Sequence, residues 1–322
     1  MNKSILFLLL FSVVLACKEK EPKDEVPESA LETTSEKDMA YEPKLSLAQW
    51  SLHVRYEAQD ANPFNFAKDA KELGFDTVEF VTQLYTKQIQ ELGFQAVIDS
   101  LKNENERHGV SCNLIMVDDE GDLADPDEAA RNIAVENHKK WVDAAVELGG
   151  HSIRVNTFGS NDPEVWSRTV VDGLKKLSEY AATKNISVLC ENHGWLSSDA
   201  DKLMAAIAEV NMPNCGTLPD FGNWCVKRAK GERWGECVEE YPDYYKGIEL
   251  MMPAAKAVSA KANRFDENGD ETRIDYYKML QIVKNAGYTG YIGIEFESEK
   301  INEPTGIRAT RDLIIKAAKK AN

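Results

Sequence analysis

The sequence lacks a surplus of basic side chains, and this absence excludes one large class of partner. Its 38 lysines and arginines are outnumbered by 54 aspartates and glutamates, which gives a formal net charge of −16. A protein that binds a nucleic-acid backbone needs a cationic surface to neutralise the phosphates. We therefore expect no nucleic-acid partner.

Cysteine is scarce, and glycine and proline are present at ordinary levels. Six cysteines in 322 residues are too few for a scaffold built on disulfides, and 19 glycines with 11 prolines exclude collagen-like and low-complexity chains. No G-x-G-x-x-G or Walker sequence is present, so nothing indicates a phosphate-binding loop. The remaining composition, 43% hydrophobic and 29% charged, is that of a globular protein.

An apolar run near the N-terminus is too short to span a membrane. Residues 5–16 are apolar except for Ser12, whereas a spanning helix needs ~20 such residues. The run suits the central region of a signal peptide, and it ends in Val-Leu-Ala-Cys at residues 14–17, which resembles the bacterial lipobox. We interpret residues 1–16 as a lipoprotein signal peptide and Cys17 as the lipidated residue. A plain signal peptide with a chance cysteine is the alternative.

The next segment has almost no large apolar side chains. Residues 17–43 are rich in Glu, Asp, Lys, Ser and Pro, so they cannot bury a core and are expected to form a flexible acidic tether. We expect an exported protein that is lipid-anchored to a bacterial membrane, with the periplasmic face of the outer membrane favoured. Disulfides can form there. The sequence predicts buried thiols at Cys112 and Cys190 and leaves room for one bridge among Cys215, Cys225 and Cys237.

From Leu45 onward one unit repeats: an amphipathic helix, a glycine-containing turn and an apolar strand. Eight strands are expected, and alternation of strand and helix predicts a parallel sheet. Eight units followed by a final helix over residues 305–320 predict an α/β fold, a single (β/α)₈ TIM barrel over residues 44–322. A doubly wound open sheet is the alternative. The strands are expected to start near Leu45, Thr77, Cys112, Ser152, Ser187, Cys215, Ala257 and Gly290.

Alternation of side chains gives each predicted strand an apolar outer face and an inner face that becomes charged toward its C-terminal end. In this fold the C-terminal end of the barrel carries the chemistry. Three carboxylates, Glu191, Asp220 and Glu295, would share a small space there, and such a cluster requires a cation or paired charges. Structural ion pairs are the alternative interpretation.

Four segments, residues 45–53, 189–194, 219–223 and 293–297, resemble the xylose isomerase-like TIM barrels, the sugar phosphate isomerase/epimerase group. The resemblance implies a divalent metal bound by Glu, Asp, His and Glu on strands five to eight. Glu191, Asp220 and Glu295 match three of these positions, but Lys261 stands where the histidine is expected, and an ammonium group cannot ligate a metal. Oxygen ligands favour Mn²⁺ or Mg²⁺, with Zn²⁺ and Co²⁺ as alternatives.

The resemblance also implies a reaction, namely proton transfer next to a carbonyl through a metal-stabilised enediolate. Glu191 and Glu295 would be the proton-transferring pair. Lys261 is expected to be functional, either as a fixed cation or, if burial lowers its pKa, as an acid or base. Asp118 and Asp119 are interpreted as loop caps. The expected substrate-binding residues are Trp50, His53, Arg154, Asn156, His193 and Asn223, the last standing where the family often has a histidine.

Export bears on the choice of substrate, because sugar phosphates are scarce outside the cytosol. The sequence therefore favours a carbohydrate isomerase or epimerase acting on an unphosphorylated sugar or keto-sugar. A keto-glycoside lyase or hydratase using the same site, and a non-catalytic carbohydrate-binding lipoprotein, are the alternatives. The charge and the tether disfavour a relative of the apurinic-site endonucleases. The sequence does not indicate an oligomeric state.

Overall fold

The structure is a computed structural model that describes residues 41–321. The expected signal peptide, Cys17 and nearly all of the expected tether lie outside the described residues, so they stay predictions. Between residues 41 and 321 there is no helix long and apolar enough to cross a bilayer.

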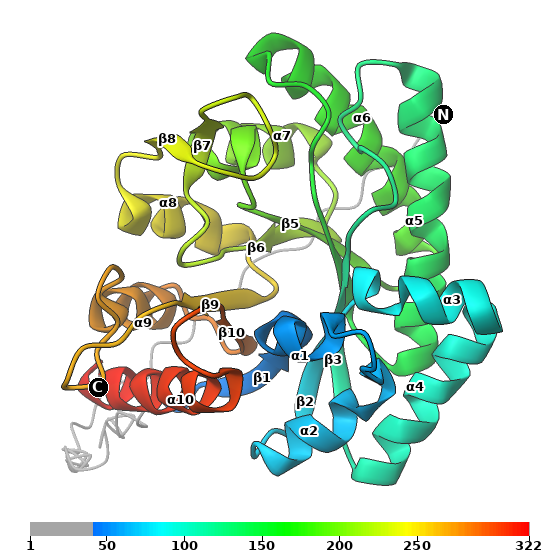
Figure 1. Cartoon of the computed structure of the whole chain (residues 1–322). Coiled ribbons are helices and arrows are strands. Elements are labelled where there is room, and N and C mark those ends of the chain that lie inside the picture. Colours follow the sequence, from blue (N-terminus) through cyan, green and yellow to red (C-terminus); the bar gives the residue numbers. More distant parts are fainter. Residues whose placement is uncertain (1–40, 322) are drawn as a thin grey trace, which may run out of the picture. The chain divides into compact units, whose positions relative to one another are not determined.

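Eight parallel strands form the barrel (Figure 1). Their order in the sheet is β6-β5-β4-β3-β2-β1-β10-β9, and parallel bridges from Thr217 to Ala255 and from Asp220 to Ser259 join the two edges. All eight strands begin within one residue of the predicted positions. Their bounds are β1 Lys44–Ala48, β2 Thr77–Val81, β3 Ser111–Val117, β4 Ser152–Val155, β5 Ser187–Glu191, β6 Cys215–Leu218, β9 Val258–Ala262 and β10 Tyr291–Phe296.

Helices surround the barrel and connect its strands (Figure 1). The main ones are α2 Phe66–Glu72, α4 Phe94–His108, α5 Glu128–Leu148, α6 Pro163–Ala182, α7 Ala200–Val210, α8 Tyr244–Met251, α9 Tyr276–Asn285 and α10 Glu303–Lys320. Shorter helical segments occupy the loops, namely η1 Gln49–Leu52, α1 His53–Glu57, η2 Pro63–Asn65, η3 Thr82–Tyr85, α3 Thr86–Leu92, η4 Trp195–Ser198 and η5 Met252–Ala254.

Local signals in the sequence explain where these helices start and stop. Asp127 and Asp162 cap the N-termini of α5 and α6 by accepting hydrogen bonds from backbone N–H groups, and Gly109 and Gly149 end α4 and α5 in the left-handed conformation. The last helix begins two residues earlier than predicted, because Asn302 caps it and the proline that follows fits its first turn.

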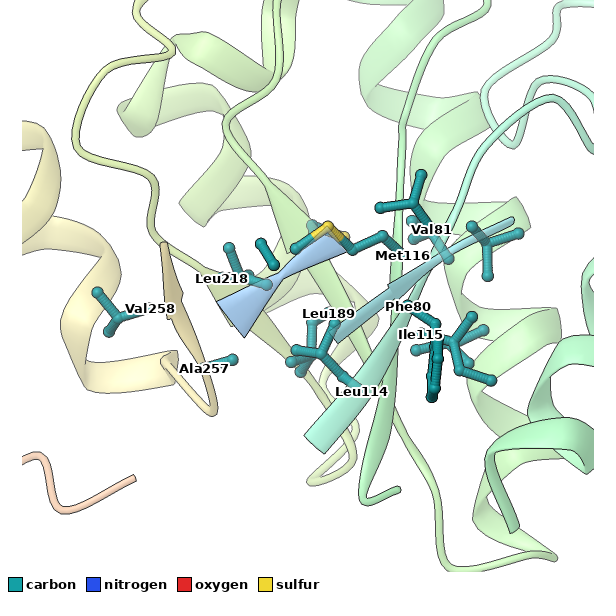
Figure 2. Close-up of a cluster of buried hydrophobic side chains, with 14 of the residues drawn as sticks. Phe80, Val81, Leu114, Ile115, Met116, Leu189, Leu218, Ala257 and Val258 are labelled. Atoms are coloured by element: carbon teal, nitrogen blue, oxygen red, sulfur yellow. The ribbon is translucent and has the colours of Figure 1, made fainter. Parts of the chain in front are cut away.

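The apolar faces of the strands pack against the helices as the alternation predicts. Ile292, Ile294 and Phe296 of β10 are fully buried. Helix α10 approaches β10 closely at Gly306, where a Cβ atom would lie 2.1 Å from the Phe296 ring. Figure 2 shows a cluster of buried apolar side chains to which β2, β3, β5, β6 and β9 all contribute.

A disulfide-bonded hairpin interrupts the repeat between β6 and α8. Strands β7 (Cys225–Arg228) and β8 (Cys237–Glu240) pair antiparallel, and a disulfide joins Cys225 to Cys237. The sequence leaves room for one bridge in this region but does not predict the hairpin, because its strands are short and mostly polar. Cys112 and Cys190 are buried free thiols, as predicted, and so is Cys215.

A carboxylic acid is buried inside the barrel at Glu79. Its Oε1 accepts hydrogen bonds from Ser46 Oγ at 2.6 Å and Asn113 Nδ2 at 2.9 Å, while its Oε2 is buried without a hydrogen-bond partner among residues 41–321. Gly293 makes room for it, since a Cβ there would lie 2.5 Å from Oε2. Burial raises the pKa of Glu79 from 4.5 to about 7.

This shift predicts a pH-dependent loss of stability. An acid with a higher pKa in the folded than in the unfolded state destabilises the fold as the pH rises between the two values. Between pH 5 and pH 8 we expect Glu79 to lower the free energy of unfolding by on the order of 2 kcal/mol. In Glu79→Gln this pH-dependent part of the free energy of unfolding should be absent. Urea denaturation of the wild-type protein and the variant at the two pH values measures it. An identical pH dependence in both proteins would contradict the expectation.

The disulfide generates a second prediction. Isolated two-stranded hairpins are only marginally stable in water, and this one has four-residue strands with irregular register. In the double variant Cys225→Ser, Cys237→Ser, amide hydrogen exchange over residues 225–240 should accelerate at least about tenfold, while the barrel strands stay protected. Reduction of the wild-type protein should reproduce the effect and should add nothing to the variant. Unchanged exchange in the hairpin would show that packing alone holds it.

Candidate active site

Three buried carboxylates converge at the C-terminal ends of the barrel strands. Glu191 ends β5, Asp220 follows β6 and Glu295 lies in β10, and one oxygen from each lies within 4.8 Å of the others. All three residues are at most 3% exposed. The structure thus brings together the three residues that the sequence predicted as a cluster.

Hydrogen bonds from the barrel wall hold two of these carboxylates in place. Ser259 Oγ lies 2.6 Å from Asp220 Oδ2 and 3.0 Å from Glu295 Oε2. The other oxygen of Asp220 accepts the backbone N–H groups of Gly222 and Asn223, at 2.8 and 2.7 Å. Burial is the main cause that raises the pKa of both Glu191 and Asp220.

Lys261 of β9 faces the same space, as expected for the residue at the position of the histidine ligand. It pairs with Glu295 across the sheet, and its Nζ lies 2.6 Å from Glu295 Oε1 and 3.0 Å from Glu297 Oε2. Burial alone would lower the pKa of Lys261, but these carboxylates outweigh it and raise the pKa well above its ordinary value. The surrounding carboxylates therefore favour the charged form of Lys261, which supports the expected fixed cation over the expected acid or base. The same ammonium lowers the pKa of Glu295 against the effect of burial.

Arg154 of β4 forms a second buried pairing. Its Nη1 lies 2.8 Å from Asp118 Oδ1 and its Nε 2.9 Å from Glu191 Oε2. Asp118 is therefore part of the site, and the interpretation of it as a loop cap is wrong. Asp118 directly follows the last residue of β3. At such a position the sequence pattern does not distinguish a residue that caps a loop from one that faces into the barrel.

A chain of hydrogen bonds fixes the orientation of His193. Asn156 Nδ2 donates to Asp118 Oδ1 at 2.6 Å, which leaves Asn156 Oδ1 facing His193 Nδ1 at 2.7 Å. The opposite amide orientation would place two acceptors against each other, so His193 donates from Nδ1. Burial, together with Arg154, lowers the pKa of His193 to about 4. The imidazole is therefore neutral near pH 7, and its Nε2 is an acceptor.

A cavity of about 430 Å³ opens above these groups. Trp50 lines it and donates from Nε1 to Glu297 Oε1 at 3.2 Å, and Asn223 lines it and donates to Glu191 Oε1 at 3.0 Å. The lining residues are Trp50, Val81, Gln83, Asp118, Arg154, His193, Asn223, Arg228, Trp234, Lys261, Glu295 and Glu297.

Two predicted substrate-binding residues do not line this cavity. Asn156 forms hydrogen bonds to Asp118 and to His193 and so holds both. His53 stacks on Trp50 with ring centroids 4.5 Å apart, and its Nδ1 donates to the Trp50 carbonyl at 2.7 Å. It faces a neighbouring cavity instead. The structure places both residues as supports of groups that do line the main cavity.

Several residues that line the cavity were not predicted from the sequence. Arg228 and Trp234 come from the β7–β8 hairpin, an insertion whose only sequence signal is the pair of cysteines that flank it. Glu297 ends the segment 293–297 that carries the family resemblance, but no role was expected for it. Gln83 lies in η3, after β2, and no pattern in the sequence singled it out.

The carboxylate cluster fits a hard divalent cation. Its donors are carboxylate oxygens, the ligands that Mg²⁺ and Mn²⁺ prefer, and their mutual separation allows one ion to contact all three. Around the cavity floor the two buried cations, Lys261 and Arg154, face five carboxylates, so a bound cation would offset the remaining negative charge. Lys261 occupies the side of the cluster where a fourth ligand was expected.

Comparisons with known proteins agree with this architecture. The family model of the xylose isomerase-like TIM barrel matches residues 67–317. An L-ribulose 3-epimerase structure has a TM-score of 0.66 at 15% identity, over 87% of this chain and 96% of that one. A 3-keto-D-glucoside 4-epimerase from E. coli gives a TM-score of 0.63 at 15% identity, over 84% and 99%. A search of curated proteins finds no significant sequence match.

One further structure was obtained with a metal. A xylose isomerase-like TIM barrel protein from Mycobacterium smegmatis, in complex with magnesium, has a TM-score of 0.61 at 14% identity, over 87% of this chain and 97% of that one. At these identities the structural likeness shows the fold, and the match to the family model covers most of the chain. The chain therefore belongs to the xylose isomerase-like TIM barrel family.

Proposed function

We propose that this protein is a carbohydrate isomerase or epimerase that moves a proton next to a carbonyl group of an unphosphorylated sugar or keto-sugar. The observation that carries the proposal is the buried cluster of Glu191, Asp220 and Glu295, held beside Lys261 at the floor of a cavity. The sugar epimerases with the same fold support it.

The size of the cavity and its walls suit a sugar. A volume of about 430 Å³ lies at the lower end of the range for small-molecule sites, and Trp50 and Trp234 offer aromatic surface. Because the nearest oxygens of Glu191 and Glu295 lie within 4.8 Å of each other, a sugar ring does not fit between those atoms. We place it above them, against Asn223, His193 and Lys261.

Glu191, Asp220 and Glu295 would hold the divalent cation, which when bound polarises substrate oxygens and stabilises negative charge on them. The chain's own residues supply the rest. Glu191 and Glu295 take and return the proton at the carbon next to the carbonyl. Lys261 supplies fixed positive charge near the oxygen that becomes negative. The neutral His193 accepts a hydrogen bond from a sugar hydroxyl through Nε2.

A lyase or hydratase acting on a keto-glycoside would begin with the same proton abstraction, and a carbohydrate-binding protein would need the cavity without the chemistry.

Export and lipid anchoring at Cys17, on the periplasmic face of the outer membrane, belong to the proposal as well. The disulfide of the β7–β8 hairpin supports an oxidising location.

Solvent exchange tests the function directly. The chain without residues 1–17, incubated with keto-sugars in deuterated water, should incorporate deuterium next to the carbonyl, as seen by NMR. Exchange should require added Mn²⁺ or Mg²⁺ and should fall at least about a hundredfold in Glu191→Gln. Glu249→Gln, which alters an exposed ion pair on α8, is the matched control. Elimination products would indicate the lyase, and sugar binding without exchange would contradict an enzymatic role.

The role of Lys261 is tested by Lys261→Met, which keeps most of the stem and removes the charge. Turnover should fall by roughly two orders of magnitude, comparable to the loss of one preorganised charge stabiliser. Metal content, measured by elemental analysis, separates an electrostatic role from loss of the metal site. Lys246→Met at the exposed pair with Glu249 serves as the control. Near-normal turnover and metal content in Lys261→Met would show that Lys261 is only part of the scaffold.

A further inference from the structure

Three cations line the cavity, and Arg228 differs from the other two. Arg154 and Lys261 each contact two carboxylates within 3.0 Å. Arg228 forms no ion pair with any carboxylate among residues 41–321. Burial lowers the pKa of Arg228, against a weaker opposite effect of Glu240, whereas the pKa values of Arg154 and Lys261 are raised. The charge of Arg228 is thus the least compensated in the cavity.

The guanidinium of Arg228 is held in place by its own hairpin. Its Nη1 donates to the carbonyl of Gly235 at 2.7 Å, and the disulfide between Cys225 and Cys237 joins the two strands that flank this turn. Its Nε is buried and has no hydrogen-bond partner within the described part of the chain. A buried donor of this kind is costly unless a ligand or water accepts from it.

The surroundings of Arg228 are shaped for part of a sugar-sized ligand. Trp234 of the same hairpin lies across Phe158, with ring centroids 5.6 Å apart, and 5.0 Å from the His193 ring. Although 52% exposed, Trp234 lines the main cavity together with Arg228. Both residues also line a side pocket of about 190 Å³ that adjoins it. A ligand over the carboxylate floor would therefore extend toward Arg228.

The charge around the side pocket limits what it accepts. Glu240 and Glu297 line it, and each already has a basic partner, since Arg273 pairs with Glu240 and Lys261 with Glu297. With these two pairs formed, Arg228 leaves the pocket lining one positive charge in excess, which a single carboxylate balances and a phosphate dianion would exceed. A single carboxylate matches the planar, two-donor edge of one guanidinium.

We propose that Arg228 and Trp234 form a subsite for the carboxylate end of a sugar acid, with Arg228 binding the carboxylate and Trp234 covering the adjacent ring carbons. This rests on the proposed function, because it names the class of substrate that the same cavity takes. The barrel floor carries the proton transfer, and the hairpin selects a uronate or aldonate over the neutral sugar.

Binding measurements test the subsite without requiring turnover. By calorimetry at low ionic strength, D-glucuronate, D-galacturonate or D-gluconate should bind the wild-type chain at least about tenfold tighter than D-glucose or D-galactose. Arg228→Gln should weaken binding of the acid at least about tenfold more than binding of the neutral sugar. Arg228→Lys keeps the positive charge but not the planar pair of guanidinium donors, so it should lose part of the preference for the acid over the neutral sugar. Lys230→Gln removes the same charge from an exposed position of the hairpin and should keep the preference.

The outcomes separate this proposal from the proposed function. Equal affinity for acid and neutral sugar in the wild type, no binding of any acid, or an equal loss of both ligands in Arg228→Gln would each overturn the subsite. Deuterium exchange on neutral sugars without a preference for acids would overturn the subsite and leave the isomerase intact. Selective binding of acids without exchange would support the subsite and overturn the enzymatic role.

Discussion

Burial of negative charge at one end of the barrel is the constraint on which the site depends. Carboxylates removed from water are stable only when paired, protonated or bound to a cation. Lys261 lies between Glu295 and Glu297, and Arg154 lies between Asp118 and Glu191. These two cations leave the cluster net negative, which is why it suits a divalent ion and a reaction that develops negative charge.

The surrounding structure accommodates these two buried cations. A Cβ at Gly222 would lie 2.7 Å from Lys261 Cγ, so glycine gives the lysine stem its path toward Glu295. Ser259 bridges Asp220 and Glu295 two residues before Lys261 on the same strand. The neighbours of Lys261 therefore fit both its shape and its charge, so the lysine at the position of the expected histidine is an integral part of the site.

The barrel and the β7–β8 hairpin make different contributions to one cavity. The barrel supplies the floor from the ends of its strands, where backbone hydrogen bonds fix each side chain. The hairpin supplies Arg228 and Trp234 from a segment cross-linked by a disulfide. This division matches a general property of the fold, in which the strands hold the chemistry and the loops set specificity.

The sequence by itself determined the eight strands, their inner and outer faces and the meeting of Glu191, Asp220, Glu295 and Lys261. Those features follow from local alternation and from the rule that parallel strands end at one face of the barrel. Only the tertiary structure decided that Asp118 joins the site, that Cys225 pairs with Cys237, that the pKa of Lys261 rises, and that Arg228 and Trp234 reach the cavity. These outcomes depend on which loops fold over the barrel and on distances between charges far apart in the chain, and no local pattern encodes either.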